Sequence, residues 1–328
     1  MSGQPESDIC VIGSINIDLV VRSPRLPSAG ETILGGRFAT FPGGKGANQA
    51  VAATRLGART ALIGCIGSDD HGRVLQGVLQ KESGLDLSRV HVRDGVPTGV
   101  ALITVAEGGE NTIVVAPGAN AGLTVEDIRE AKGIIEGSAT LLVQLESPIE
   151  AVLEAMSIAR AAGRAVVLNA SPALKAGPER RDLLKGCDVL VVNRTEAAAL
   201  AGVDPQVDPA RIMLRVAESG PPTIIVTLGN QGAMFVHHGR PKRVPTVRVP
   251  ALDSVGAGDA FAAALAVGWV DVAKAASRSD DEFRAVDAAA FRAAVAGALA
   301  TGKRGAIPSM PTRAELDRGA AELERIGG

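Results

Sequence analysis

Six short runs of the chain are apolar at nearly every position, and stretches with helical periodicity separate them. The runs are ICVIG (9–13), TALIG (60–64), TLLVQL (140–145), AVVLNA (165–170), DVLVVN (188–193) and TIIVTLG (223–229). A strand that is apolar on both faces is buried on both sides, as in a parallel sheet covered by helices. The alternation therefore predicts an α/β fold with right-handed crossovers and a ligand crevice at the carboxyl ends of the strands.

The clearest helix is predicted in SPIEAVLEAMSIARAAG, where apolar residues recur at i, i+3, i+4 and i+7 from Ile149. Ser147 is expected to cap this helix, with Pro148 at the first helical position and Glu150 completing a capping box. Gly163 is expected to end it.

Composition excludes several classes of protein. Of 328 residues, 46% are hydrophobic and 21% are charged, which indicates a folded chain with a full core. Aromatic residues make up 2% and the net charge is −2, so neither a base-stacking surface nor a basic surface for a nucleic-acid phosphate backbone is expected, and we predict no nucleic-acid partner. No apolar run reaches the length of a membrane span, and MSGQPESDIC does not resemble a signal peptide. We therefore expect a cytoplasmic protein without a membrane partner.

The cysteines and histidines show no metal-ligand spacing. Each cysteine lies in or beside an apolar run, so a reduced core residue is predicted at Cys10, Cys65 and Cys187. His237 and His238 precede Gly239, and the pair is predicted to lie in a solvated turn.

Two regions interrupt the alternating pattern. IDLVVRS with TILGGRFATF, and later GVALITVAEGGENTIVVAPG, contain short strand-like runs, and the second predicts a hairpin around EGGEN. We expect a small antiparallel sheet, formed by residues of about 17–42 and 95–117, that acts as a lid and as a dimer contact. The polar segment 271–287 is predicted to be a loop followed by a helix from Ser279, and no chemistry is assigned to it.

The glycine-rich stretch FPGGKGANQAVAATRLG is not a P-loop, whose pattern is GxxxxGK followed by Ser or Thr. Alanine stands where the first glycine of that pattern should be, and glycine follows the lysine in place of Ser or Thr. One interpretation is a glycine turn before an ordinary helix. The alternative is that Gly43, Gly44 and Gly46 let a ligand approach main-chain amides, with Lys45 and Asn48 as side-chain donors.

The segment GSINIDLV lacks the GxGxxG pattern, which removes the main support for a dinucleotide-dependent dehydrogenase. Asn16 and Asp18 lie two residues apart, so on an extended segment their side chains point the same way. A carboxylate beside an amide suits the hydroxyls of a polyol. A turn stabilised by these two side chains is the alternative.

VVNRTEAAAL places Asn193 and Glu196 directly after a predicted strand. The spacing is that of a capping box, so a purely structural role explains both residues. The pair also lies where α/β proteins bind ligands, and Glu196 there could hold a hydrated Mg²⁺ beside a nucleotide.

DSVGAGDAFAAALAVGW carries Gly256, Ala257 and Gly258 into the start of a helix, followed by Asp259. The small residues leave their N–H groups accessible and the helix dipole favours negative charge, so the turn predicts an anion hole. Asp259 could then accept the proton of a substrate hydroxyl while the amides hold a phosphoryl group. A helix capped by aspartate is the alternative.

These stretches, in this order, resemble the ribokinase family of carbohydrate and nucleoside kinases. The matching segments cover residues 9 to about 311 and are GSINIDLV, PSAGET, GGKGANQAVAA, TGVALI, GEN, PGAN, LLVQLESP, NRTEA, VTLGNQGA, DSVGAGDAFAAAL and KRGAIPSMP. The resemblance implies a ribokinase-like three-layer αβα domain over 1–328, with a mostly parallel central sheet and the discontinuous β lid described above. It also implies a homodimer formed through that lid.

The activity implied by the resemblance is ATP-dependent phosphorylation of D-ribose at O5, with Asp259 as the base and residues 256–258 as the anion hole. The implied sugar ligands are Asn16, Asp18, Gly44, Lys45, Gly46, Asn48, Glu146 and Asp259. The implied ATP-binding residues are Asn193, Thr227, Leu228, Gly229, Asn230, Gln231, Gly232 and Gly258. Glu196 is implied to act on Mg²⁺ through water, and a K⁺ ion is implied at Asp253, Val255, Ala300, Lys303, Gly305 and Ser309.

The chain departs from the family pattern at a few positions. Ala294 stands where Asn or His commonly contacts the adenine, Ser254 replaces a frequent Thr, and the segment 271–287 is longer than usual. Another sugar or nucleoside kinase of the family, such as a deoxyribose or adenosine kinase, is the alternative function. A non-catalytic sugar-binding regulator is a third hypothesis, which the retention of Asp259 and Glu196 disfavours.

Overall fold

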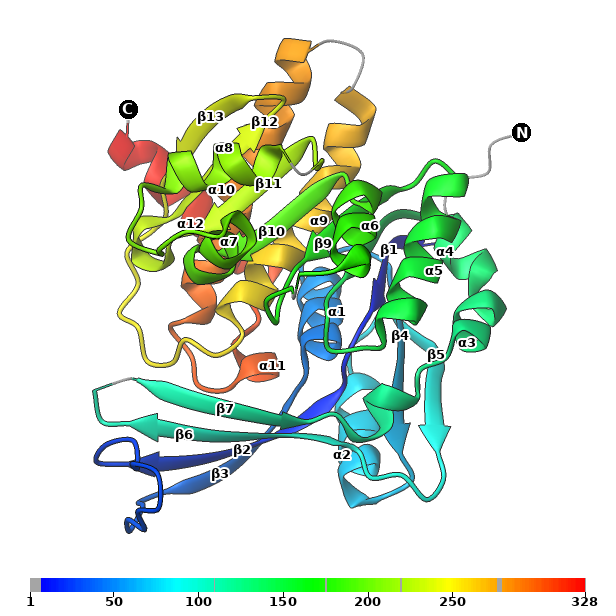
Figure 1. The fold of residues 1–328 in the computed structure, drawn as a ribbon, viewed down its shortest axis with the longest axis vertical. Helices are drawn as coiled ribbons and strands as arrows, with labels where there is room; N and C mark the ends of the chain where they lie inside the picture. The colour runs from blue at the N-terminus through cyan, green and yellow to red at the C-terminus, as the bar shows by residue number, and fades with distance from the viewer. Residues whose placement is uncertain (1–6, 109, 175, 219, 276–278, 328) are drawn as a thin grey trace.

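The computed structural model describes residues 7–108, 110–174, 176–218, 220–275 and 279–327, and it contains two sheets (Figure 1). The central sheet has nine strands in the order β13-β12-β11-β10-β9-β8-β1-β4-β5. Its strands are β1 Ser7–Ile12, β4 Thr60–Gly67, β5 Leu85–Arg93, β8 Ser138–Val143, β9 Ala165–Asn169, β10 Val189–Asn193, β11 Thr223–Thr227, β12 Ala233–His237 and β13 Arg240–Val244. The seven neighbouring strands β11-β10-β9-β8-β1-β4-β5 pair in parallel, and β12 and β13 add an antiparallel edge beside β11. The predicted α/β architecture is therefore confirmed.

Two hydrophobic clusters cover the two faces of this sheet. In β1, Ile9 and Val11 belong to one cluster and Cys10 and Ile12 to the other, as the alternation of side chains along a strand requires. The first face packs against α1 Lys45–Arg55, α2 Asp70–Leu79, α9 Ala257–Ala275, α10 Ser279–Ala300 and α12 Arg313–Gly327. The second packs against α3 Val125–Glu130, α4 Lys132–Gly137, α5 Ile149–Ala161, α6 Pro178–Gly186, α7 Arg194–Ala201 and α8 Pro209–Ala217. This arrangement gives the three layers expected.

The second sheet projects from the central body, at the bottom of Figure 1, with strand order β3-β2-β6-β7. Its strands are β2 Asn16–Ser23, β3 Phe38–Gly43, β6 Gly99–Ala106 and β7 Asn111–Ala116. The outer pairings are antiparallel, including the predicted hairpin of β6 and β7, but the central pairing of β2 with β6 is parallel. The sheet is assembled from two chain segments that both leave the central body in the same direction, so their first strands run alongside each other.

Several local predictions need correction. Pro148 has an extended conformation (φ −53°, ψ 131°), so the helix α5 begins at Ile149 and the expected capping box of Ser147 and Glu150 does not form. Gly163 has φ 69° just beyond the end of α5, as predicted for a residue that ends a helix. Residues 271–275 continue α9 instead of forming a loop, and α10 does begin at residue 279.

The prediction of a solvated turn is confirmed for His238 and wrong for His237. His237 is the last residue of β12 and is 4% exposed, while His238 is exposed with φ 45°. All three cysteines are free and buried, as predicted. Among the residues described, no helix combines the length and the apolar character needed to span a membrane.

Candidate active site

A cavity of about 260 Å³ lies where the carboxyl ends of β9, β10 and β11 face the small sheet. It brings together most of the side chains that the sequence singled out. The predicted site residues that line it are Asn16, Asp18, Gly44, Lys45, Asn48, Glu146, Asn193, Glu196, Thr227, Val255, Gly256, Gly258 and Asp259. The small sheet contributes an apolar wall, formed by Ala101, Ile103, Ile113 and Val115.

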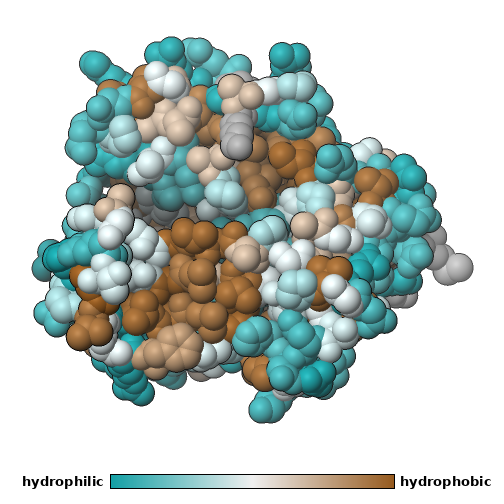
Figure 2. Space-filling view, turned by 60° about the horizontal axis from the view of Figure 1, so that its bottom comes forward, coloured by the Kyte–Doolittle hydropathy of each residue, from teal (hydrophilic) through white to brown (hydrophobic). Residues whose placement is uncertain are grey.

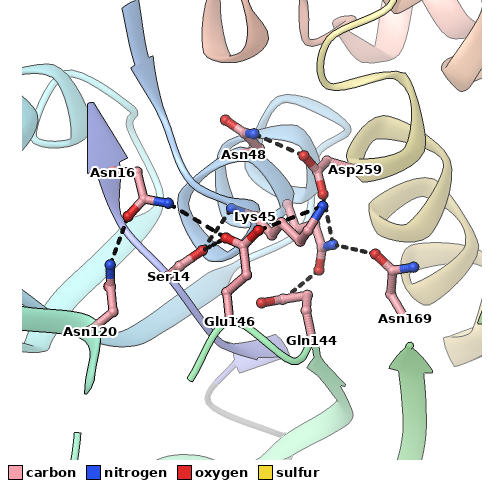
Figure 3. Close-up of polar contacts among 10 residues, drawn as sticks. Ser14, Asn16, Lys45, Asn48, Asn120, Gln144, Glu146, Asn169 and Asp259 are labelled. Atoms are coloured by element: carbon pink, nitrogen blue, oxygen red, sulfur yellow. Dashed lines mark hydrogen bonds and ion pairs between the residues drawn. The ribbon is translucent and has the colours of Figure 1, made fainter. Parts of the chain in front are cut away.

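Asp259 lies in the first turn of α9 and is 7% exposed. Two amides from α1 hold its carboxylate: Asn48 Nδ2 donates to Oδ2 at 2.8 Å, and Gln49 Nε2 donates to Oδ1 at 2.9 Å (Figure 3). Gln49 in turn donates to Asn169 Oδ1 at 3.1 Å and accepts from Gln144 at 2.5 Å. The carboxylate is thus fixed in position at the bottom of the cavity by neutral donors.

The turn before Asp259 requires glycine at position 256. Gly256 has φ 81°, and a Cβ there would lie 2.8 Å from Met310 Cε and 3.1 Å from Ala306 Cα. Gly258 has open space on its side-chain face, and it lines the cavity. Main-chain N–H groups in the first turn of a helix have no intrahelical acceptor. The turn therefore presents donors and the positive end of α9 to the cavity, as an anion hole requires.

Glu146 is the centre of a polar network on the other side of the cavity (Figure 3). Its carboxylate accepts a hydrogen bond of 2.6 Å from Ser14 Oγ and a long one of 3.5 Å from Asn16 Nδ2. Lys45 Nζ lies 3.8 Å from Glu146 Oε1. Asn120 donates to Asn16 Oδ1 at 2.7 Å, which fixes the orientation of the Asn16 amide.

The carboxylates strongly affect one another. Burial, followed by the charges of Asp259 and Glu146, raises the pKa of Asp18 to about 7. Burial opposes the charged form of Lys45, but the surrounding carboxylates, Asp259 first, outweigh that effect and raise its pKa. The cavity therefore holds excess negative charge that Lys45 compensates only in part.

Among the residues that the structure describes, two buried residues that line the cavity have acceptors without partners. Asn48 Oδ1 is buried without a hydrogen bond. The carboxylate of Asp18 receives none from the residues that the structure describes, although the side chain is only 6% exposed. Buried acceptors without partners cost free energy, and hydroxyl groups of a bound polyol would satisfy both.

The nucleotide-binding residues expected from the sequence lie along the carboxyl ends of β10 and β11. Asn193 and Glu196 form the predicted capping box, with reciprocal bonds of 2.8 Å. Glu196 uses only Oε2 in this box, so its other oxygen suits a water-mediated contact with Mg²⁺. Thr227 reaches the cavity, whereas the residues that follow form a partly exposed 3₁₀ turn outside it, namely Leu228, Gly229, Asn230, Gln231 and Gly232.

Gly46 and Ala257 do not line the cavity. Gly46 packs against Gly13, where an added Cβ would lie 2.5 Å from the Gly13 carbonyl carbon. Ala257 N donates to Ser254 O at 3.3 Å, so this amide is already engaged in the turn.

The residues expected to hold K⁺ fall into two groups. Asp253 joins Val255 and Gly305, because its carboxylate accepts from both main-chain N–H groups at 3.1 and 3.0 Å. The side chains of Ser309 and Lys303 are engaged elsewhere, with Ala306 O and Glu315 respectively. Lys303 and Ala300 can offer only main-chain oxygens, the ligand type that suits a hard monovalent cation, while the Ser309 hydroxyl oxygen keeps lone pairs that could also accept one.

The sequence analysis missed part of the polar network. Ser14, Gln49, Asn120 and Asn169 were not singled out, although all four lie inside quoted segments. Gln49 follows Asn48 on the same helix, and adjacent helical positions do not normally share a face. Both residues reach Asp259 because its carboxylate offers two oxygens, one to each amide.

An ionisable carboxylate beside an anion-binding helix start, next to a pocket of hydroxyl-binding groups, defines a kinase that acts on a small polyol. Residues 6–313 match the model of the pfkB family of carbohydrate kinases, and the chain belongs to this family.

Individual relatives agree with this assignment. The ribokinase of Haemophilus influenzae is 37% identical over 94% of this chain and 96% of its own length. A deoxyribokinase of Salmonella typhi is 35% identical over 77% of this chain and 83% of its own. The structure of Arabidopsis thaliana ribokinase complexed with ribose and ATP superposes with a TM-score of 0.80 at 30% identity, covering 96% of this chain and 98% of that one.

Proposed function

We propose that the protein is an ATP-dependent ribokinase that transfers the γ-phosphoryl group of ATP to O5 of D-ribose. The observation that carries the proposal is the position of Asp259 between the two halves of one cavity. On one side lie hydroxyl-binding groups, and on the other the turn of Gly256 and Gly258 faces the carboxyl ends of β10 and β11. A phosphoryl donor and a hydroxyl acceptor would meet at this carboxylate.

In the proposed mechanism, the Asp259 carboxylate accepts the proton of the O5 hydroxyl as O5 attacks the γ-phosphorus. The bond from the γ-phosphorus to the bridging oxygen of ADP breaks, and ADP carries the electron pair away. Main-chain donors of the 256–258 turn stabilise the charge on the phosphoryl oxygens during transfer. Asn48 and Gln49 hold the carboxylate in line with the acceptor throughout.

The sugar would be held by groups whose hydrogen-bonding capacity is unused. Asn48 Oδ1 and Asp18 accept from ribose hydroxyls, and Lys45 donates to one. Hydrogen bonds from the hydroxyls favour the ionised form of Asp18, so binding of the sugar would release a proton near neutral pH.

Two cations complete the proposal. Glu196 would hold Mg²⁺ through water, and the ion would neutralise charge on the ATP phosphates. A K⁺ ion would lie near Asp253, Val255 and Gly305, directly beside the anion-binding turn. The side chain of Asp253 already orders that loop, so the ion would stabilise the turn and not contact the sugar.

The substrate is tested by an ADP-release assay with D-ribose, 2-deoxyribose, fructose 6-phosphate and adenosine, with and without K⁺. We expect D-ribose to give the highest kcat/KM and K⁺ to raise the rate. A deoxyribose kinase is the second candidate, because the Salmonella typhi relative is nearly as similar. Preference for 2-deoxyribose or adenosine would overturn the assignment of ribose while leaving the kinase assignment intact.

We also propose that the chain forms a homodimer through the small sheet. Leu102 and Val114 face each other across β6 and β7 and are 53% and 66% exposed. Figure 2 shows a continuous hydrophobic area at the end of the molecule that carries this sheet. Light scattering should give the mass of a dimer for the native chain and of a monomer for Val114→Lys. The cytoplasmic location remains a prediction from the sequence.

A further inference from the structure

His237, His238 and Glu282 form a cluster at the opposite end of the central sheet from the active site. Their potential ligand atoms all lie within 4.8 Å of one another. His237 ends β12, His238 begins the turn to β13, and Glu282 lies in the first turn of α10, near the top of Figure 1. The three side chains border a cavity of about 380 Å³ that shares no lining residue with the active site.

The imidazole of His237 has one nitrogen without a partner. Its Nδ1 lies 2.9 Å from Thr223 Oγ1, which fixes the ring orientation. Its Nε2 is buried without a hydrogen bond to any residue that the structure describes, and it lies 3.7 Å from Glu282 Oε1. That distance is too long for a hydrogen bond, so Nε2 points towards the carboxylate without contacting it.

These separations suit a shared metal ion. A tetrahedral site with bonds of about 2.1 Å places ligand atoms about 3.4 Å apart. The 3.7 Å between Nε2 and Oε1 is close to this value, and the exposed His238 and half-buried Glu282 have room to adjust. A hydroxyl partner for Nδ1 is the kind of outer contact that fixes metal-binding histidines in proteins.

A neighbouring cation, Arg240, would oppose metal binding if its charge were unpaired. The guanidinium of Arg240 is nearby, but Asp280 at 3.1 Å and the ring of Phe283 at 4.1 Å already engage it.

The conformation of His238 contributes to the cluster. Its φ of 45° is the only positive value at a non-glycine residue in the part of the chain that the structure describes. Adjacent residues on a regular strand point to opposite faces. The left-handed conformation removes this alternation and places the two rings 4.4 Å apart, which explains why the sequence spacing gave no metal signal.

We propose that His237, His238 and Glu282 bind one Zn²⁺ ion that joins the β12–β13 turn to the start of α10. A donor set of two imidazoles and one carboxylate binds Zn²⁺ in preference to Mg²⁺. The fourth position faces the cavity and takes a water molecule. The ion stabilises the fold and takes no part in phosphoryl transfer.

The test is calorimetric titration of the untagged, chelator-treated protein with ZnSO₄ alone, repeated with MgSO₄. We expect one Zn²⁺ per chain, no comparable Mg²⁺ binding, and a rise in Tm of a few degrees with excess Zn²⁺. His238→Asn keeps a residue that tolerates positive φ, and Glu282→Gln keeps the shape of the side chain. Each should weaken Zn²⁺ binding by at least about tenfold, because each removes a ligand.

His71→Ala on α2 is the control and should bind Zn²⁺ like the native chain. Circular dichroism without zinc verifies that each variant is folded. Kinase activity with Mg²⁺ should be unchanged in both site variants, so failure of the zinc site and failure of the proposed kinase function are distinguishable. The absence of stoichiometric binding in the native protein would overturn the proposal. Equal affinity in the native chain and in both site variants would also overturn it, since the ion would then bind elsewhere.

Discussion

The sugar half and the nucleotide half of the active site are built differently. In the sugar half, Asn16 is hydrogen-bonded to Glu146 and Asn120 before any ligand is present. Asn48 is hydrogen-bonded separately to Asp259. In the nucleotide half, Asn230 and Gln231 are exposed and make no side-chain hydrogen bond with residues that the structure describes. Under the proposed function, we therefore expect preorganised side chains to recognise the sugar, and mainly main-chain groups and cavity shape to recognise the nucleotide. Substitutions in the two halves should therefore have very different effects.

The largest effect is expected at the junction of the two halves. Asp259→Asn removes the proton acceptor while keeping the shape of the side chain, and should lower kcat by about 10² to 10⁴. Steady-state kinetics with D-ribose and ATP measure this. Asp70→Asn, which changes another aspartate in the first turn of a helix, is the control. An unchanged kcat for Asp259→Asn would remove this residue from the mechanism.

Asp18→Asn should separate sugar binding from stability. The pKa of Asp18 is raised from 3.8 to about 7, so between these values the folded state binds more protons than the unfolded state. The free energy of unfolding therefore falls as pH rises through this window, and the loss is fully present above pH 7. Removing the charge should stabilise the ligand-free protein at pH 8 by on the order of 2 to 4 kcal/mol, and by almost nothing near pH 4.

Urea unfolding at pH 4, 6 and 8 measures this dependence, with the exposed Asp94→Asn as control. The same variant should raise KM for ribose, because it loses a hydroxyl acceptor. If the stability difference between Asp18→Asn and the native chain did not grow with pH, the buried charge would not be destabilising.

Gln49→Leu tests whether the carboxylate of Asp259 needs its second amide. Gln49 does not line the cavity, so it acts by positioning, and kcat should fall by about 10-fold while KM for ribose changes little. Gln76→Leu, the same change at an exposed position of α2, should leave both constants unaltered. A rise in KM equal to the fall in kcat would instead indicate direct contact with the sugar.

The smallest effect is expected in the nucleotide half. Asn230→Ala should change KM for ATP by less than about threefold, since exposed substitutions typically alter free energies by under 0.5 kcal/mol. Asn16→Ala should raise KM for ribose by about tenfold, because Asn16 belongs to the preorganised network. Initial rates with each substrate varied in turn compare the two. Similar changes in both variants would contradict the difference between the two halves.

Most structural features that depend on residues close together in the sequence were predicted well. Features that depend on residues far apart in the sequence were not. The strand from Asp188 to Asn193 was predicted almost to the residue, because burial on both faces leaves a local apolar pattern. The capping box of Asn193 and Glu196 is also local, and it forms as expected. By contrast, the parallel pairing of β2 with β6 joins residues about eighty positions apart, which no local pattern encodes.

The site shows the same limit. Asp259 and Asn48 were identified from motifs, but the bonds of Gln49 and Gln144 depend on how α1, α9 and β8 pack together. His237 was misassigned because it packs near Glu282 and Phe283 at the start of α10, more than forty residues later. Long-range contacts of this kind require coordinates.

Asn16 and Asp18 lie on β2, a strand of the small sheet, whereas Glu146 and Asp259 belong to the central body. The proposed sugar site therefore spans two parts of the molecule. Asp18 makes no hydrogen bond to the central body in the described structure, so only a bound sugar would connect the two parts at this residue. Any outward swing of the small sheet would carry Asp18 away from the pentose and break the site. In the proposed kinase, occupancy by a sugar and closure of the sheet would be linked equilibria, so a pentose bound to Asp18 would also shield the reacting phosphate from hydrolysis by solvent.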